Sequence, residues 1–182
     1  QLAASYRLVE ELGWSFLIFG HLTARVPGTE KNFLINPYGL MYDEINASNL
    51  VKINLEGKKV EESDWDVNPA GFIIHSAVHA SKSHAHCVMH THTNAGMAMA
   101  ALKKGLINID FSGSAFHKRV AYHDFEGVTL RKDECKRIAD DLGEKSIMVL
   151  KNHGLLTTGE TVAEAFMKLY TLESACKVQL LA

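Results

Sequence analysis

The stretch Val88–Gly96, which reads VMHTHTNAG, decides how the rest of the chain is interpreted. An apolar run leads into it, and His90 and His92 stand on either side of Thr91. If this segment is a strand, its two-residue period places both imidazoles on one face, about 7 Å apart along the chain. Two such rings can converge on one metal ion, but an HxH pair alone also fits two structural histidines at the end of a strand.

A third metal ligand is available in the segment Lys151–Gly154, which reads KNHG and follows an apolar strand predicted at Ile147–Lys151. His153 would complete a set of three imidazoles, and Gly154 would let the backbone turn sharply beside a ligand. Three histidines with one open coordination position are typical of catalytic metal sites. The pattern therefore favours a metal site, although nothing in the sequence proves that the two strand ends meet.

The chain has ten histidines in all, and the other seven are interpreted separately. His75 and His79 lie four residues apart on one predicted helix face and could hold a metal, but no Glu lies between them to form HExxH. We expect one of this pair to pack in the core and the other to be exposed. His21 starts a strand and can line a cleft. Loop or surface positions are expected for the remaining ones: His84, His86, His117 and His123, which precedes Asp124.

The composition is that of a globular protein of one domain, with 182 residues, 47% of them hydrophobic and 22% charged. A net charge of −2 gives no reason to expect nucleic acid or an acidic membrane as a partner. No apolar run is long enough for membrane insertion. The three cysteines are far apart, so we expect free thiols in a reducing, cytoplasmic compartment. The sequence contains no phosphate-binding glycine loop and no GxSxG motif.

The mixture of strands and helices predicts a single α/β domain with a central, mainly antiparallel sheet and helices on its faces. One helix is expected from Pro69, which suits a first helical turn after Asn68, and another from a capping box at Thr161. Others are expected to end at Gly13 and to span Ala95–Leu102 and Lys132–Leu142. The expected strands, several of them paired as hairpins, are His21–Val26, Asn32–Asn36, Val51–Leu55 with a partner ending at Val60, Cys87–Thr91, Arg119–His123, Ile147–Lys151 and Leu155–Thr158.

Several segments together resemble the class II aldolase/adducin family. They follow the family's order along nearly the whole chain: GHLTAR at Gly20–Arg25, LINPYG at Leu34–Gly39, NPAGFIIH at Asn68–His75, then the HxH and NHG segments. Each segment alone is weak evidence, whereas the set is specific. The resemblance implies a three-layer α/β/α domain covering residues 1–182, trimmed at one or both ends, that forms a homotetramer.

The resemblance also implies a metal centre. Three histidines bind zinc or a similar divalent ion in the family's sugar-phosphate aldolases and epimerases, and the matching residues are His90, His92 and His153. Zn²⁺ is the first choice, with Fe²⁺, Mn²⁺ and Co²⁺ as alternatives, because imidazole suits several divalent ions. In the family a neighbouring subunit supplies an aromatic residue, for which Phe111 and Tyr122 are both candidates. The substrate-binding candidates are Gly20, His21, Asn36, Gly39, Asn68, Gly71 and Phe111.

The chain departs from the family where phosphate and the acid/base group would lie. In the sugar-phosphate aldolases the helix before HxH opens with two phosphate-binding serines and an acid that carries the proton. Here these positions are Pro69, Ala70 and Gly71, which offer neither hydroxyl nor carboxylate, and the family's Gly-Asn becomes Gly20-His21. We therefore expect a metal site without a phosphate pocket. The candidates for the proton carrier are, in descending order, His21, Tyr122, His123 and Asp124.

Three functions stay open. The first is a metal-dependent carbon–carbon lyase, of the aldolase or decarboxylase type, that acts on a small non-phosphorylated carbonyl compound or acid. The second is a non-catalytic binding or scaffold domain with a vestigial metal site, because the NPAGF variant resembles the adducin-like branch. The third is an iron-dependent oxygenase on the same fold, since three histidines do not by themselves choose zinc over iron.

Overall fold

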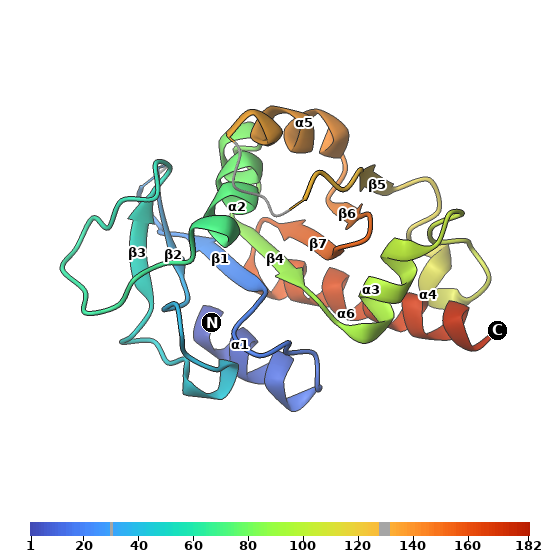
Figure 1. Cartoon of the computed structure of the whole chain (residues 1–182), viewed down its shortest axis with the longest axis horizontal. Helices are drawn as coiled ribbons and strands as arrows, with labels where there is room; N and C mark the ends of the chain where they lie inside the picture. The colour runs from blue at the N-terminus through green and yellow to red at the C-terminus, as the bar shows by residue number, and fades with distance from the viewer. Residues whose placement is uncertain (30, 128–131) are drawn as a thin grey trace.

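The computed structural model of the chain describes residues 1–29, 31–127 and 132–182. Within these residues a mixed, mainly antiparallel sheet of seven strands forms the centre, and helices cover both of its faces (Figure 1). The α/β fold that the sequence predicts, with a central antiparallel sheet, is thereby confirmed.

The sheet joins strands that are far apart in the sequence. Its order is β3-β2-β1-β4-β7-β6-β5, so the strand that carries the HxH segment, β4, lies in the middle. Neighbouring strands are antiparallel except for β5 and β6, which are parallel. The strands are β1 (His21–Arg25), β2 (Asn32–Ile35), β3 (Val51–Asn54), β4 (Cys87–Thr91), β5 (Val120–His123), β6 (Ile147–Leu150) and β7 (Gly154–Gly159).

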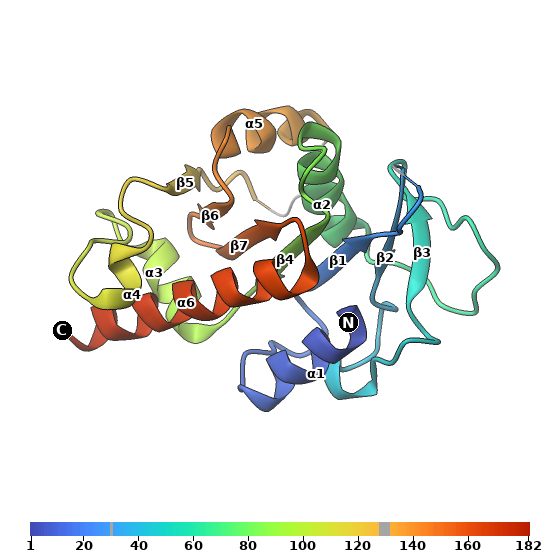
Figure 2. The ribbon, with the colours of Figure 1, turned by 180° about the vertical axis from the view of Figure 1, so that it is seen from behind.

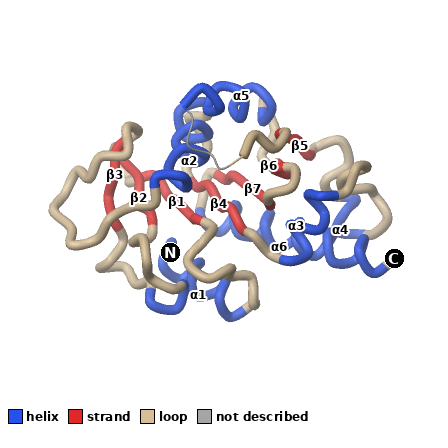
Figure 3. The backbone as a smooth tube through the Cα atoms, in the orientation of Figure 1, coloured by secondary structure: helices blue, strands red, loops and turns tan. Residues whose placement is uncertain are grey.

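Two pairs of helices enclose the sheet. α2 (Pro69–Ser81) and α5 (Lys132–Leu142) lie together on one face, while α1 (Leu2–Glu11) and α6 (Val162–Leu181) lie on the other (Figures 1 and 2). The segment between β3 and α2 forms a long loop outside the edge of the sheet (Figure 3). The remaining elements are short: η1 (Tyr42–Glu44), α3 (Asn94–Ala101) and α4 (Phe111–Ser114).

Strand β4 is buried along its whole length, because helices cover both faces of the sheet. Cys87 and Met89 pack into the core cluster that contains residues of α1 and α6. Val88 packs into the second cluster, with residues of α2 and α5. Alternation along the strand therefore directs the side chain of His90 to the face covered by α2.

Most of the local expectations are confirmed. β1 pairs with β2 and β6 pairs with β7 as antiparallel neighbours, as the turn residues predict. The side chain of Thr161 accepts a hydrogen bond from the Glu164 backbone amide and caps α6. The segment ending at Val60 is different, since it makes an isolated bridge to β3 rather than a second strand.

The prediction that one of His75 and His79 would be exposed is wrong. Both side chains are buried between α2 and β1.

Among the described residues, no helix is both long enough and apolar enough to cross a membrane.

Candidate metal centre

Three histidines converge where β4 ends and β7 begins. Antiparallel pairing of β4 with β7 sets Thr91 opposite Leu155, so the turn that precedes β7 lies beside the residues that follow β4. The Nε2 atom of His90 lies 2.7 Å from Nε2 of His92 and 3.2 Å from Nε2 of His153. The sheet register thus brings together the two strand ends that the sequence could not join.

The orientation of His90 is fixed by a hydrogen bond on its far side. Its Nδ1 atom lies 2.8 Å from the carbonyl oxygen of Leu155, which can only accept, so Nδ1 carries the proton and Nε2 presents a lone pair. A backbone partner of this kind is usual for metal-binding histidines.

All three imidazoles are held in the neutral state that metal binding requires. Burial lowers the pKa of His90 well below its ordinary value, and the neighbouring His92 and His153 lower it further. Burial, followed by the charge of His153, lowers the pKa of His92 to about 4. The pKa of His153 is lowered by burial and then by His123. Neutral nitrogens packed so closely repel one another unless a cation or a proton lies between them, which fits a metal ion.

Gly154 has a different role from the one expected. Its backbone has no positive φ; the residue of the turn in the left-handed region is Asn152, at φ 54°. A Cβ atom on Gly154 would overlap the carbonyl oxygen of Thr91 and would lie 3.1 Å from the His92 ring. Glycine is therefore required here because the backbone approaches the histidines closely.

Two phenylalanines that no sequence pattern marks lie beside the metal centre. Phe16 contacts His92 edge-on with ring centroids 6.2 Å apart, and Phe125 contacts His153 edge-on at 6.4 Å. Both side chains are partly exposed, at 43% and 52%. His90 is buried, whereas His92 and His153 are half-buried, so the cluster is accessible from the side of His92 and His153, each of which contacts one of the two phenylalanines.

His21 occupies the space that the glycine at position 71 leaves open. It pairs with His90 across β1 and β4 and therefore shares the face covered by α2. A Cβ atom on Gly71 would overlap the Nδ1 and Cε1 edge of the His21 imidazole. Burial, with the charges of His92 and His153, lowers the pKa of His21 to about 3. Its Nε2 atom is buried and has no hydrogen-bond partner among the residues that the structure describes.

The other candidate proton carriers lie further from the three histidines or are already paired. The hydroxyl of Tyr122 accepts a hydrogen bond from the Leu106 amide at 3.0 Å, and its ring packs against the cluster on the opposite face of the sheet. Asp124 is exposed and forms an ion pair with Lys151 at 2.7 Å.

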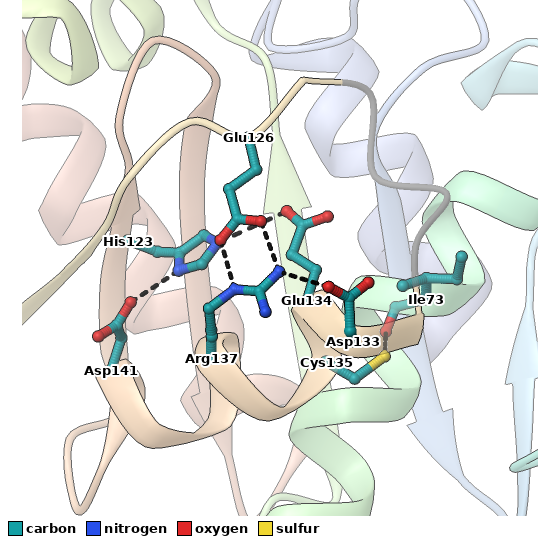
Figure 4. A network of polar contacts seen from close by, with 8 residues as sticks. All are labelled: Ile73, His123, Glu126, Asp133, Glu134, Cys135, Arg137 and Asp141. Carbon is teal, nitrogen blue, oxygen red and sulfur yellow. Dashed lines mark hydrogen bonds and ion pairs between the residues drawn. The ribbon is translucent and has the colours of Figure 1, made fainter.

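The expectation that His123 takes a loop or surface position is wrong, because His123 is the buried last residue of β5. It belongs to a separate polar network with side chains of α5 (Figure 4). Its Nδ1 atom lies 2.7 Å from Asp141, and its Nε2 atom lies 3.5 Å from the buried carboxylate of Glu134. A small cavity is lined by both His123 and His153, so this network reaches the back of the metal centre.

The candidate substrate-binding residues fall into three groups. The backbone of Gly20 lies close to His90, because a Cβ atom on Gly20 would be 3.0 Å from the His90 carbonyl oxygen, and Gly71 lies against His21. Asn36 is instead held in the core, where it accepts a hydrogen bond from Tyr6 at 2.9 Å. The others lie at exposed or boundary positions: Gly39 in a turn, Asn68 before α2, and Phe111, which is 93% exposed at the start of α4.

Comparisons with known proteins agree with this geometry. The family model for the class II aldolase and adducin N-terminal domain matches residues 1–180. An aldolase II superfamily protein from Pseudomonas syringae has a similar structure, with a TM-score of 0.96 and 48% identity, over 100% of this chain and 72% of the other. L-fuculose 1-phosphate aldolase from Glaciozyma antarctica PI12 has a TM-score of 0.89 and 34% identity, over 100% and 71%.

A relative of another kind is alpha-adducin from Rattus norvegicus. It is 44% identical over 182 residues, which cover 98% of this chain but only 25% of that protein. The matches thus include both an aldolase and an adducin, and the two share this domain. With its seven-stranded fold, its three converging histidines and a family match over residues 1–180, the chain belongs to the class II aldolase and adducin N-terminal domain family.

Proposed function

We propose that the protein is a divalent-metal-dependent carbon–carbon lyase, of the aldolase or decarboxylase type, that acts on a small non-phosphorylated carbonyl compound or acid. The observation that carries the proposal is the convergence of three neutral imidazole nitrogens, from His90, His92 and His153, at a half-exposed point. Zn²⁺ is the proposed ion, because three histidines with an open position are a zinc set. When bound, such an ion polarises a carbonyl oxygen as a Lewis acid.

His21 is the proposed proton carrier. It lies beside His90 on the same face of the sheet and fills the space at Gly71, where a side chain from α2 would otherwise project. A neutral imidazole has one bare ring nitrogen, which can accept a proton from the substrate and return it.

The surroundings of the metal centre favour a substrate without phosphate. The first turn of α2 begins Pro69-Ala70-Gly71, which supplies no hydroxyl group. Phe16 and Phe125 flank the histidines with partly exposed rings. Aromatic surface of this kind excludes water and contacts apolar parts of a substrate.

We further propose that the protein works as a homotetramer in the cytoplasm. The phenyl ring of Phe111 is 93% exposed, which suits a side chain that inserts into a neighbouring subunit. Cys87, Cys135 and Cys176 are free thiols, as in a reducing compartment. Light scattering of the wild type and Phe111→Asp tests the assembly: a tetramer that the substitution dissociates supports it, and a monomeric wild type contradicts it.

Metal analysis tests the site itself. The purified protein is expected to hold about one equivalent of zinc, and His92→Ala is expected to lose it. His84→Ala is the matched control, because His84 is an exposed histidine in the α2–β4 loop. A wild-type protein that binds no metal even after zinc is added would contradict the proposal.

A substrate panel tests the reaction. We expect turnover of small hydroxy or keto acids and aldols, with little gain from a phosphate group, and loss of activity in His92→Ala and after chelation. Preferential cleavage of sugar phosphates such as L-fuculose 1-phosphate, the substrate in the name of one relative, would contradict the proposed substrate class.

The likeness to alpha-adducin favours a second candidate, a scaffold domain that keeps the metal site without catalysis. A protein that holds zinc but turns over no member of the panel would support it. Native iron together with consumption of oxygen would instead identify an oxygenase.

A further inference from the structure

A line of buried polar side chains runs between α2 and β1, away from the metal centre. Gly71, His75 and His79 are spaced by one helical turn each and face the strand residues His21 and Thr23. We call His21, Thr23, His75 and His79 the histidine seam. All four side chains are at most 4% exposed.

The hydrogen bonds of the seam have only one consistent direction. At its far end Nδ1 of His79 lies 2.9 Å from the carbonyl oxygen of Ala85, which can only accept, so Nδ1 carries the proton. Burial lowers the pKa of His79 to about 4, so the ring is neutral and its Nε2 is an acceptor. The Thr23 hydroxyl, 2.8 Å from this Nε2, therefore donates to it.

The same reasoning fixes the tautomer of His75. The single hydroxyl proton of Thr23 is already donated to His79, so Thr23 Oγ1 can only accept from Nδ1 of His75, which lies 2.7 Å away. His75 is buried, and desolvation holds its pKa well below the ordinary value. Neutral His75 with its proton on Nδ1 has a bare lone pair on Nε2.

Two neighbouring rings at the near end of the seam each have one unpartnered nitrogen within the described residues. The Nε2 atoms of His75 and His21 are both buried and lack a hydrogen-bond partner within the described residues. Their rings are neighbours, with centroids 6.1 Å apart and an interplanar angle of 83°. A buried polar atom left without a partner is destabilising, and one hydrogen bond shared by these two nitrogens, direct or through one water, would satisfy both.

We propose that His75 is a positioning residue that fixes the tautomer of His21: Nε2 of His75 accepts a hydrogen bond from Nε2–H of His21, directly or through one water. The lone pair of His21 is then on Nδ1, the edge that fills the space at Gly71. This inference deepens the proposed function, in which His21 carries the proton, and it names the atom that does so.

The seam orients His21 but does not conduct protons to solvent. It ends on the carbonyl oxygen of Ala85, which has no proton to release and cannot pass one on. A purely structural role would be served as well by apolar residues, because hydrophobic packing needs no hydrogen-bond partner. A chain of side chains whose hydrogen bonds can run in only one direction is what holds an imidazole in one tautomer. We call this arrangement the tautomer lock.

Substitution at Thr23, which hydrogen-bonds to His75 and His79 but to none of the three candidate metal ligands, tests the lock. Thr23→Val keeps the shape but removes the hydroxyl, so His75 loses the acceptor that holds its proton on Nδ1. Thr23→Ser is the matched control, since it retains the hydroxyl. Long-range proton–nitrogen NMR of the full chain identifies which ring nitrogen of His21 carries the proton.

The wild type and Thr23→Ser are expected to show the His21 proton on Nε2, and Thr23→Val is expected to move it wholly or partly to Nδ1. His75→Phe, which removes the acceptor itself, is expected to give the same change. A wild-type His21 with its proton on Nδ1 would overturn the inference. So would a tautomer that is the same in the wild type and in folded Thr23→Val.

Kinetics separate this inference from the proposed function. If the protein is a lyase, Thr23→Val is expected to lower kcat by about 10- to 100-fold with little change in KM or zinc content, because a misplaced proton impairs acid–base transfer. The serine variant is expected to recover most of that loss. If no substrate is turned over but the His21 proton moves in Thr23→Val, the lock stands and the lyase proposal fails.

Discussion

The two sides of α2 meet very different surroundings. On one side Ile74, Ala77 and Val78 pack with α5 and the sheet in an apolar cluster. On the other, His75 and His79 face β1 through a buried line of hydrogen bonds. Both sides are equally inaccessible to water, so burial alone does not explain their composition.

The apolar side needs no explanation beyond the hydrophobic effect, which stabilises the fold in proportion to the area buried. The polar side gains much less, because each hydrogen bond replaces one made to water. Histidines lie on this side of α2 where isoleucine would fit, so a requirement other than packing determines the residues there. The nearest source of that requirement is the metal centre, which adjoins the end of the seam at His21.

The largest effect on stability is expected on the apolar side. Leu142→Ala, in the cluster shared by α2 and α5, removes a fully buried side chain and should lower the free energy of unfolding by about 3 kcal/mol. Urea unfolding measures the loss, and zinc content of the folded protein should not change. A loss of metal with little loss of stability would mean that the two sides of α2 are not separable.

Gly71→Ala should lower stability by about 1–3 kcal/mol, although alanine in place of glycine ordinarily stabilises a helix by up to about 1 kcal/mol. The sign is reversed because the new methyl group would overlap the imidazole of His21. Adding His21→Ala should remove most of the penalty, which a double-mutant cycle measures. Equal penalties with and without His21 would contradict the contact.

Part of the pH dependence of stability should come from the polar side of α2. Burial, with the charges of Arg25 and His86, lowers the pKa of His79 to about 4, so the unfolded chain takes up a proton first as the pH falls. Stability is therefore lost progressively from about pH 6.5 down to about pH 4. In His79→Gln the loss at pH 5.5 should be about 1 kcal/mol smaller than in the wild type. Parallel pH profiles from urea unfolding would refute this.

The smallest effect is expected at the outer edge of α5, in the network of Figure 4. Asp141→Asn weakens the 2.7 Å contact with His123, but Asp141 is 44% exposed. We expect a loss of about 0.5–1 kcal/mol and no change in zinc content. Loss of zinc in this variant would place His123 in the support of the metal centre, since His123 and His153 line one cavity.

The sequence could predict the cluster of three histidines because they lie at strand ends with clear patterns. HxH follows an apolar strand, and His153 follows another, so only the pairing of β4 with β7 had to be supplied. Strand pairing joins residues that are distant in the sequence, and local periodicity carries no information about it. The resemblance in the order of the family's segments along the chain indicated this pairing instead.

The seam could not be predicted in the same way. The spacing of His75 and His79 correctly places both on one helix face, but only a hydroxyl from another element, Thr23, lets both be buried. The fit of His21 against Gly71 likewise joins residues from two elements. Phe16 and Phe125 come from loops with no periodicity. Each of these depends on tertiary contacts that a single sequence does not encode locally.

The placement of the ligands also has a consequence for folding. His90 and His153 are 63 residues apart in the chain, and both lie at the same end of the pairing of β4 with β7 in the middle of the sheet. The proposed ion, when bound between them, would act as a reversible cross-link that closes a long loop and stabilises the native state by mass action. Chelation should therefore accelerate amide hydrogen exchange in β4 and β7 first, so that the strands most deeply buried in the fold become those most sensitive to the supply of metal.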